Sequence, residues 1–276
     1  MDFTDIEYEK VGCAVTIHLN RPETLNAFTY DTLREIRQAV DRAVADEDVV
    51  GIIFTGKGRG FSSGLDASVL VAVTSGNNMS TDKAPSSDQV ADEELPGIFS
   101  YLLEVPKPVI AAINGVAAGG GLILALMSDL RIASEAAAFT TVFLKRGLIA
   151  EHGSSWILPR LMGTGRALDL LWMSDKIDAD RALQLGLVDQ VVSADALLAS
   201  ARDYIERLAV TSSPAAIAET KRLVYRHLGS NYTDALIEAN ESQNRFVSGE
   251  DAKEGAMALI EKRAPHFKRL GTADLN

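Results

Sequence analysis

Two glycine-rich turns in this 276-residue chain can present bare main-chain N–H groups to a ligand. The first reads GFSSGLD over residues 60–66, and the second reads AAGGGL over residues 117–122. Each follows an apolar run typical of a buried strand. Three consecutive glycines lose much conformational entropy on folding, so close approach to a ligand atom is one reason for them. We expect the N–H groups of Leu65 and Gly120 to face negative charge that develops on an oxygen atom.

The apolar run at residues 122–127, directly after the second turn, predicts a helix. The first N–H groups of a helix have no partner within it, and the helix dipole adds to their positive potential. A plain packing interpretation stays open, because small residues also let a strand, a turn and a helix lie close together. A membrane span is a further alternative, since no residue from 109 to 128 is charged. Asn114 and four glycines within that run argue against it.

Glu151 is a candidate for proton transfer near these turns. It stands beside His152 in the loop predicted over residues 147–155. A carboxylate can act as a general acid or base, but a glutamate in a polar loop is often only solvated, and composition alone favours that interpretation. His152 can orient Glu151, bind substrate or merely fill the loop.

The composition narrows the class of protein. With 47% hydrophobic and 24% charged residues, the chain is typical of a globular protein. A net charge of −11 argues against non-specific binding to nucleic acid. The single cysteine, Cys13, allows no internal disulfide, and the four histidines have no metal-ligand spacing, so we expect no metal site. The first ten residues are acidic and lack the apolar core of a signal peptide, which predicts a cytoplasmic location.

Strand patterns and helix patterns alternate along the chain. The strands and helices that they predict must position the two turns and Glu151. Apolar runs predict strands over residues 11–19, 49–55, 109–113, 130–133 and 187–192. Helical spacing predicts helices over residues 29–46 and from 179 to 186, and later over 197–208, 214–228 with Ser213 as its N-cap, 233–247 and 250–263. This order predicts an α/β core over residues 1–195 and a C-terminal helical region over residues 196–276, which we expect to pack on a partner subunit. The polar segment 73–94 is predicted to be a mobile loop or lid.

Four stretches carry a resemblance to a known family. They are LNRPETLNAF, FSSGLD, INGVAAGGG followed by DLRIAS, and EGAMALIEKRAPHF. Together they resemble the enoyl-CoA hydratase/isomerase (crotonase) family, over about residues 11–267. The resemblance implies a spiral of repeated β-β-α turns and C-terminal helices that build a homotrimer or a homohexamer. It also implies an acyl-CoA thioester as substrate, with its carbonyl oxygen between the N–H groups of Leu65 and Gly120, and no cofactor beyond the coenzyme A of the substrate.

The same resemblance extends the candidate site beyond the two donors. Gly64 permits an unusual dihedral angle, and Asp66 can cap a helix that begins near Ala67. Lys262 with Phe267 is the better candidate for binding coenzyme A, although Lys262 and Lys221 can also be plain solvated charges. Asp129 is expected to be a structural cap or a buried hydrogen-bond partner. The full set of expected substrate-binding residues is Leu25, Ala27, Ser63, Gly64, Asp66, Gly119, Phe143, Lys262 and Phe267.

The acid–base positions are where the chain departs from the commonest pattern. Hydratases of the family resemble one another in carrying one glutamate two residues after the glycine triplet and another after DLRIAS. Those positions fall on Ile123 and Phe143, and neither side chain can move a proton. Glu151 is similar in placement to the acidic residue of peroxisomal-type enoyl-CoA isomerases and of ring-epoxide isomerases. The resemblance therefore favours Glu151 as the catalytic carboxylate, with Phe143 shaping an apolar acyl pocket.

Double-bond isomerisation is the reaction that this pattern favours. Three alternatives stay open: an enoyl-CoA hydratase of fatty-acid oxidation, a carbon–carbon or thioester hydrolase that uses the same oxyanion hole, and a catalytically silent protein that binds coenzyme A. The hydratase and the hydrolase would both add water to their products. The silent protein would bind its ligand without turnover.

Overall fold

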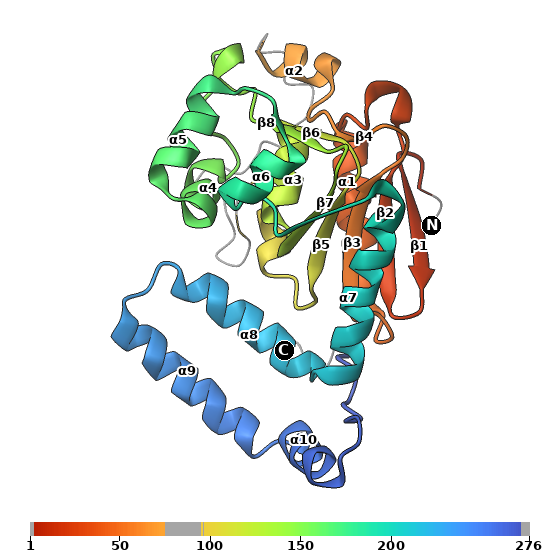
Figure 1. The fold of residues 1–276 in the computed structure, drawn as a ribbon, viewed down its shortest axis with the longest axis vertical. Helices are drawn as coiled ribbons and strands as arrows, with labels where there is room; N and C mark the ends of the chain where they lie inside the picture. Colours follow the sequence, from red (N-terminus) through yellow and green to blue (C-terminus); the bar gives the residue numbers. More distant parts are fainter. Residues whose placement is uncertain (1–2, 75–94, 96, 272–276) are drawn as a thin grey trace.

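The chain folds into an α/β body with three helices extending below it (Figure 1). The computed structural model describes residues 3–74, 95 and 97–271. Most of the segment predicted to form a mobile loop or lid, residues 75–94, lies outside the described residues. None of the helices in the described ranges is long and apolar enough to cross a membrane.

A six-stranded sheet forms the centre of the body. Its strands, in spatial order, are β1 (Ile6–Val11), β2 (Ala14–Leu19), β3 (Gly51–Gly56), β5 (Val109–Ile113), β7 (Leu130–Ser134) and β10 (Gln190–Val192). Only β1 is antiparallel to its neighbour, and the other pairs are parallel. The single strand predicted over residues 11–19 is wrong in this respect, because the chain turns at Gly12 and Cys13 to form a hairpin. Since most of β1 is exposed, its apolar signal is too weak to mark it.

A second, four-stranded sheet lies beside the first. It has the order β4 (Gly60–Ser62), β6 (Val116–Ala118), β8 (Ala138–Thr140) and β9 (Ile177–Asp178), and the first three strands are parallel. A strand of the large sheet runs directly into each of these three strands, and a helical segment follows each one. These segments are α2 (Ala67–Thr74), α3 (Gly120–Met127) and the 3-10 helix η3 (Leu144–Arg146). The predicted α/β class, with its repeated β-β-α turns, is confirmed.

Helices cover both faces of the large sheet. On one face, α1 (Tyr30–Ala45) buries Ile36 and Val40, and it begins at Thr29, whose side chain forms a reciprocal capping box with Thr32. On the other face, α7 (Leu197–Thr211) packs Ala201 and Ile205 against the strands. Parallel strands need such cover on both sides, and their apolar runs reflect it.

The helix after the second glycine-rich turn is the centre of the main core. Every residue of α3 is buried, which is the expected environment for a helix that is apolar all round. The helices α4 (Ser154–Met162), α5 (Thr164–Met173) and α6 (Ala179–Leu185) complete this half of the body (Figure 1). The short 3-10 helices η1 (Pro22–Thr24), η2 (Ser100–Leu103) and η4 (Ala194–Ala196) connect the main elements.

The last three helices form an arm, defined here as α8 (Pro214–His227), α9 (Tyr232–Val247) and α10 (Glu250–Glu261). The N-cap of α8 is Ser213, as predicted, because its hydroxyl accepts the Ala216 N–H at 3.2 Å. Ion pairs join α8 to α9, with 2.8 Å between Arg222 Nη1 and Glu238 Oε1. Figure 1 shows the arm at the opposite end of the molecule from α2. Several of its large apolar side chains are exposed, namely Val224, Tyr232, Ile237, Leu259 and Ile260.

Candidate active site

The two glycine-rich turns touch each other through backbone atoms. Strands β4 and β6 are paired in parallel, which places the ends of both turns on the same edge of the small sheet. A Cβ atom on Gly64 would lie 2.8 Å from the Ala118 carbonyl oxygen and 2.8 Å from the Gly120 nitrogen. Gly64 also has a φ of +92°, so both the contact and the dihedral angle require glycine here. The peptide units that carry the Leu65 and Gly120 N–H groups are therefore neighbours.

The direction of the Leu65 N–H follows from an isolated parallel bridge between Phe28 and Leu65. In this bridge Phe28 N donates to Gly64 O at 2.8 Å, and Asp66 N donates to Phe28 O at 2.9 Å. Because the C=O and N–H of a trans peptide point in opposite directions, fixing Gly64 O toward Phe28 turns the Leu65 N–H away from it. Among the described residues, the Leu65 N–H has no hydrogen-bond acceptor.

The second N–H belongs to the first residue of α3. The helix begins at Gly120, two residues earlier than the apolar pattern predicts. The start of α3 packs closely on the first turn, because a Cβ atom on Gly121 would lie 2.2 Å from Ser62 O, so this approach requires glycine. As an N–H in the first helical turn, that of Gly120 has no intrahelical partner, and none of the described residues accepts it. Two neighbouring main-chain donors are thus left with free hydrogens.

Residues 24–28 form hydrogen bonds with several residues of the first glycine-rich turn. Ser63 N donates to Leu25 O at 2.9 Å, and the Ser63 hydroxyl donates to Thr24 O at 3.1 Å. The Asn26 side chain donates to Gly60 O at 2.8 Å, and Ser62 Oγ donates to Asn26 O at 2.8 Å. Leu25, Ala27, Ser63 and Gly64 therefore lie together beside Leu65. Their role in binding substrate stays a prediction.

Asp66 caps the helix that follows. Its Oδ1 accepts the Ser68 N–H at 3.1 Å and the Ser68 hydroxyl at 2.7 Å, and α2 begins at Ala67 as predicted. These hydrogen bonds, together with the charge of Arg21, lower the pKa of the Asp66 carboxyl. The carboxylate is therefore ionised at neutral pH. Its predicted contact with substrate remains a prediction.

The segment after β8 lies against the glycine triplet. Gly119 N donates to Thr140 O at 3.2 Å, and a Cβ atom on Gly119 would lie 3.3 Å from Val142 Cγ2. Val142 has a φ of +54°, which is uncommon for a β-branched residue. Phe143 follows it and is buried in the main core. The backbone of this segment thus connects the second turn to the segment that carries Glu151.

Glu151 lies in the turn before α4. Its backbone oxygen accepts the Ser154 N–H at 3.0 Å and the Ser154 hydroxyl at 2.8 Å. The segment between Phe143 and Glu151 is compact, because Leu148 N donates to Phe143 O at 3.0 Å and Glu151 is only three residues after Leu148. The Glu151 side chain is 32% exposed, and its carboxylate accepts no hydrogen bond from the described residues. It is accessible, and among the described residues only His152, at 4.0 Å, lies within ion-pair range of it.

His152 stands close to Glu151 without bonding to it. The distance from His152 Nε2 to Glu151 Oε2 is 4.0 Å, which is beyond hydrogen-bond range. Burial lowers the pKa of His152, and the nearby Glu151 charge opposes this only in part. The imidazole is therefore neutral at neutral pH. Its backbone adopts a left-handed conformation, φ +50°, ahead of Gly153.

The two positions where an acid or base was expected by resemblance are apolar in their surroundings as well. Ile123 lies in the second turn of α3 and is fully buried, and Phe143 is 5% exposed. Both belong to the main hydrophobic core. Neither position offers a group that can carry a proton.

Lys262 and Phe267 are not brought to this site within one chain. Lys262 ends α10 and is exposed, while the Phe267 ring lies near Gly255 on the same helix. Figure 1 shows α10 at the far end of the molecule from β4 and α2. Their predicted contact with coenzyme A remains a prediction that requires another copy of the chain.

Arg21 and Val142 were not among the predicted site residues. Arg21 donates to Ala27 O and pairs with Asp66, although 45 residues separate it from Asp66 in the chain. Arg21 lies in LNRPETLNAF, one of the four stretches that carry the family resemblance, but no local pattern assigns a role to its side chain. The unusual φ of Val142 has no local signature either. In the described ranges, no three His, Cys, Asp or Glu side chains form a group that could hold a metal.

Comparisons with known proteins agree over nearly the whole chain. The model of the enoyl-CoA hydratase/isomerase family matches residues 9–270. A short-chain-enoyl-CoA hydratase of Clostridium acetobutylicum is 33% identical, over 95% of this chain and 97% of that protein. The 1,2-epoxyphenylacetyl-CoA isomerase of Escherichia coli is 32% identical, over 92% and 94%. The crystal structure of an enoyl-CoA hydratase/isomerase from Mycobacterium paratuberculosis has a TM-score of 0.85 and 30% identity, over 96% of this chain and 99% of that one.

Proposed function

Because this chain belongs to the enoyl-CoA hydratase/isomerase family of acyl-CoA enzymes, we propose that it shifts a double bond along the acyl chain of a coenzyme A thioester. The observation that carries this proposal is the pair of adjacent main-chain donors, Leu65 N–H and Gly120 N–H, with no acceptor among the described residues. The enzyme class rests on the family, and the reaction within that class is our inference.

The two donors would bind the thioester carbonyl oxygen. Removing a proton from the adjacent carbon places negative charge on that oxygen, and N–H groups held in advance stabilise the charge without reorganising. The dipole of α3 adds to this effect at Gly120. Together these groups make the C2 proton of a 3-enoyl thioester more acidic.

Glu151 would then move the proton. Its carboxylate takes the C2 proton, the electron pair shifts to form the enolate, and the proton returns at C4, so that the double bond moves from C3–C4 to C2–C3. One carboxylate suffices, since the same group removes and returns the proton. The side chain of Glu151 supports this role, since it is accessible and its carboxylate accepts no hydrogen bond from the described residues.

Hydration is the competing reaction, because the similar proteins include a hydratase as well as an isomerase. Adding water requires a group that orients water at C3 and another that delivers a proton to C2. With Ile123 and Phe143 buried and apolar, Glu151 would have to do both. The side chains present therefore favour isomerisation.

The arm suggests how the remaining predicted residues act. Its exposed apolar side chains on α8, α9 and α10 are suited to a subunit interface. A homotrimer, or two trimers in a hexamer, would cover them. Such an assembly could bring Lys262 and Phe267 of one copy toward the coenzyme A bound by another.

A panel of acyl-CoA thioesters tests the reaction class. Purified protein is incubated with 2-enoyl and 3-enoyl thioesters of increasing chain length, and the products are analysed by mass spectrometry with chromatographic separation. We expect an isobaric product from a 3-enoyl thioester. A product heavier by one water would assign hydration, free coenzyme A would assign thioester hydrolysis, and binding without any product would indicate a silent protein.

A further inference from the structure

We propose that Arg21 is a positioning residue that aims and polarises the Leu65 N–H through two successive peptide groups. This inference rests on the proposed role of that N–H as a donor to the thioester oxygen. Arg21 itself touches no substrate in this arrangement. It acts through the backbone of residues 27–28 and 64–65.

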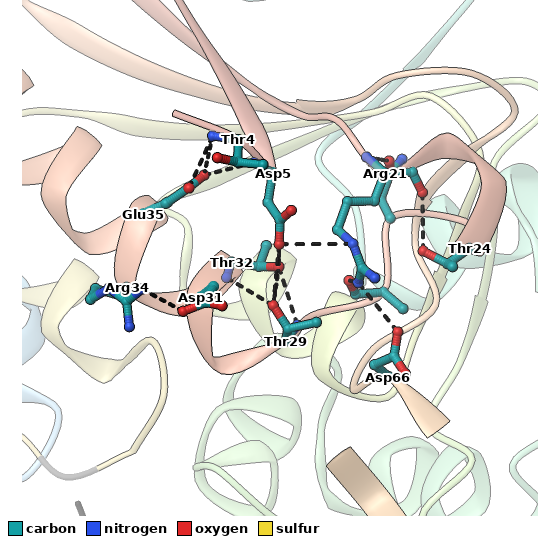
Figure 2. Close-up of polar contacts among 12 residues, drawn as sticks. Thr4, Asp5, Arg21, Thr24, Thr29, Asp31, Thr32, Arg34, Glu35 and Asp66 are labelled. Atoms are coloured by element: carbon teal, nitrogen blue, oxygen red, sulfur yellow. Dashed lines mark hydrogen bonds and ion pairs between the residues drawn. The ribbon is translucent and has the colours of Figure 1, made fainter. Parts of the chain in front are cut away.

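The first step is a charged hydrogen bond to the backbone. Arg21 Nη1 lies 2.6 Å from Ala27 O, and the Arg21 side chain is 20% exposed. Figure 2 shows the Arg21 guanidinium between Asp5 and Asp66, apart from Arg34, the other arginine labelled there. A hydrogen bond from a charged donor is shorter and about twice as strong as a neutral one. The Ala27 carbonyl is therefore both held and polarised.

The second step passes through two trans peptides. Ala27 O belongs to the peptide whose N–H is that of Phe28, and Phe28 N donates to Gly64 O at 2.8 Å. Gly64 O belongs in turn to the peptide whose N–H is that of Leu65. Each peptide accepts on one side and donates on the other. The order is thus Arg21 guanidinium, Ala27–Phe28 peptide, Gly64–Leu65 peptide and, last, the free Leu65 N–H.

Chains of hydrogen bonds strengthen one another, by roughly 10–30% per bond. A positive charge at the start of this chain draws electron density from each carbonyl and makes the next N–H a better donor. The Leu65 N–H, which ends the chain, should therefore bind a developing oxyanion more strongly than an isolated amide would. It should also be held in a fixed direction, because both peptide planes are fixed.

The guanidinium is held by two carboxylates, those of Asp5 and Asp66. Arg21 Nε lies 3.8 Å from Asp5 Oδ2, and Nη1 lies 3.3 Å from Asp66 Oδ2. The hydroxyls of Thr29 and Thr32 donate to Asp5, so this carboxylate is itself fixed (Figure 2). The other oxygen of the Asp66 carboxylate accepts a hydrogen bond from the Ser68 hydroxyl, so this carboxylate interacts with both Arg21 and Ser68. These contacts orient the planar Arg21 guanidinium so that its Nη1 donates to Ala27 O.

The carbonyl stretch of a bound thioester measures this effect directly. Saturated acyl-CoA thioesters, which have no double bond to move, are labelled with ¹³C at the thioester carbonyl, and the one that binds most tightly is used at saturation. Isotope-edited infrared spectra compare the bound carbonyl with the same carbonyl in water. The frequency belongs to bound molecules only, so a variant that is partly unfolded gives a weaker band at an unchanged position.

Three variants separate the proposed role from a structural one. Arg21→Met removes the charge and all donors while it keeps an apolar side chain, and Arg21→Lys keeps the charge and a single donor nitrogen. Arg34→Met is the matched control, since Arg34 is exposed on α1 and pairs with Asp31 without touching the bridge (Figure 2). Rates with the substrate found in the thioester panel are measured for each.

In the wild-type protein we expect the bound carbonyl to absorb at lower frequency than in water. Arg21→Met should lose roughly 10–30% of that shift, and kcat should fall about fivefold to tenfold, less than the hundredfold or more expected for loss of a whole donor. KM should change little, Arg21→Lys should recover part of both effects, and Arg34→Met should match the wild type.

The outcomes that contradict the inference differ from those that contradict the proposed function. If the wild type shows no shift, or if no thioester binds, the donor pair does not hold the carbonyl and the proposed function is wrong. If the wild type shows the shift and Arg21→Met shows the same shift, the donors act as proposed and Arg21 does not. An equal loss in Arg34→Met would also refute the role of Arg21.

Discussion

Lys221 of α8 donates a hydrogen bond to Asp129, two residues after the end of α3, with 2.8 Å between Nζ and Oδ2. Asp129 also accepts from Tyr225 of α8 at 2.9 Å and from the Val109 N–H at the start of β5 at 2.8 Å. Asp129 is thus the hydrogen-bond partner that was expected, although its side chain is 18% exposed and therefore only partly buried. The alternative of a solvated Lys221 is wrong, because its side chain is only 8% exposed. This ion pair links α8 of the arm to the segment of the body that follows α3.

The first prediction concerns this attachment. Lys221→Met removes the buried cation that pairs with the partly buried Asp129 carboxylate, and breaking a buried pair typically costs about 3–5 kcal/mol. We expect the free energy of unfolding to fall by about that amount in urea titrations. Lys253→Met, at an exposed position of α10, should have an effect near zero. Equal effects of the two substitutions would show that Asp129 does not need Lys221.

The second prediction removes one donor of the site. Gly120 is the first residue of α3, where proline is well accepted because it lacks only an N–H that has no helical partner. Gly120→Pro should lower the isomerisation rate about 100-fold to 1,000-fold. Thr164→Pro, at the equivalent first position of α5, is the matched control and should leave the rate unchanged.

Circular dichroism must show that both proline variants keep their helices. If Gly120→Pro is folded and turns substrate over at the wild-type rate, the glycine triplet serves packing alone. The plain packing interpretation of the two turns would then hold.

The helices and strands that carry the site were largely predictable, because their signals are local. The pattern predicts β5 over residues 109–113, the range that the strand occupies, and Thr29 marks the start of α1. The predicted start of α3 is two residues too late, since glycines have poor helix propensity. The close approach of Ser62 that requires glycine at position 121 is a tertiary contact, which gives no local signal.

The contacts that orient the donors were not predictable from local pattern. Phe28 meets Gly64, and Arg21 meets Asp66, only after the chain has folded. No periodicity or cap signals a pairing between turns that are tens of residues apart. The composition of a turn can therefore suggest which N–H groups are free, but their direction depends on tertiary contacts.

The third prediction concerns proton transfer. Glu151→Gln keeps the shape of the side chain but cannot accept a proton, so the isomerisation rate should fall about 100-fold to 10,000-fold. Binding of a saturated acyl-CoA, measured by calorimetry, should be retained. Glu135→Gln, at an exposed carboxylate after β7, is the control and should behave as the wild type. Wild-type turnover by Glu151→Gln would make Glu151 a bystander.

The fourth prediction is the assembly. We expect the intact protein to sediment as a trimer or a hexamer, with the exposed apolar side chains of the arm at the interface. Leu259→Glu combined with Ile260→Glu places two charges on the exposed face of α10 and should yield smaller species. Leu183→Glu, on α6 of the body, should leave the mass unchanged. A monomeric wild type in analytical ultracentrifugation would refute the assembly.

The fifth prediction is a pH dependence of stability. Lys107 is buried, and its Nζ donates to Ala43 O at 2.9 Å and to Asp46 O at 2.7 Å at the end of α1. Burial lowers the pKa of Lys107 from 10.5 to about 8. Below pH 8 the lysine is charged in the folded and the unfolded state, so the cost of burying the charge is constant.

Between pH 8 and 10.5 the folded protein releases this proton before the unfolded chain does. The unfolded state then binds more protons, so the stability of the wild type should rise with pH relative to Lys107→Met. The gain should reach about 3 kcal/mol, measured by urea unfolding at a series of pH values. A difference between the two proteins that does not vary with pH would contradict the lowered pKa.

The backbone origin of the two donors affects how such a site can evolve. A main-chain N–H is present whatever the side chain, and only proline removes it. Mutation can therefore alter the residues at Ile123, Phe143 and Glu151 one at a time while the donors at Leu65 and Gly120 are inherited intact. What selection must preserve is small, namely the absence of side chains at Gly64 and Gly121, where the two turns meet. If the two donors bind the thioester as we propose, a lineage that keeps these two glycines and the contacts that orient the donors can exchange one acyl-CoA reaction for another while it still binds the thioester carbonyl.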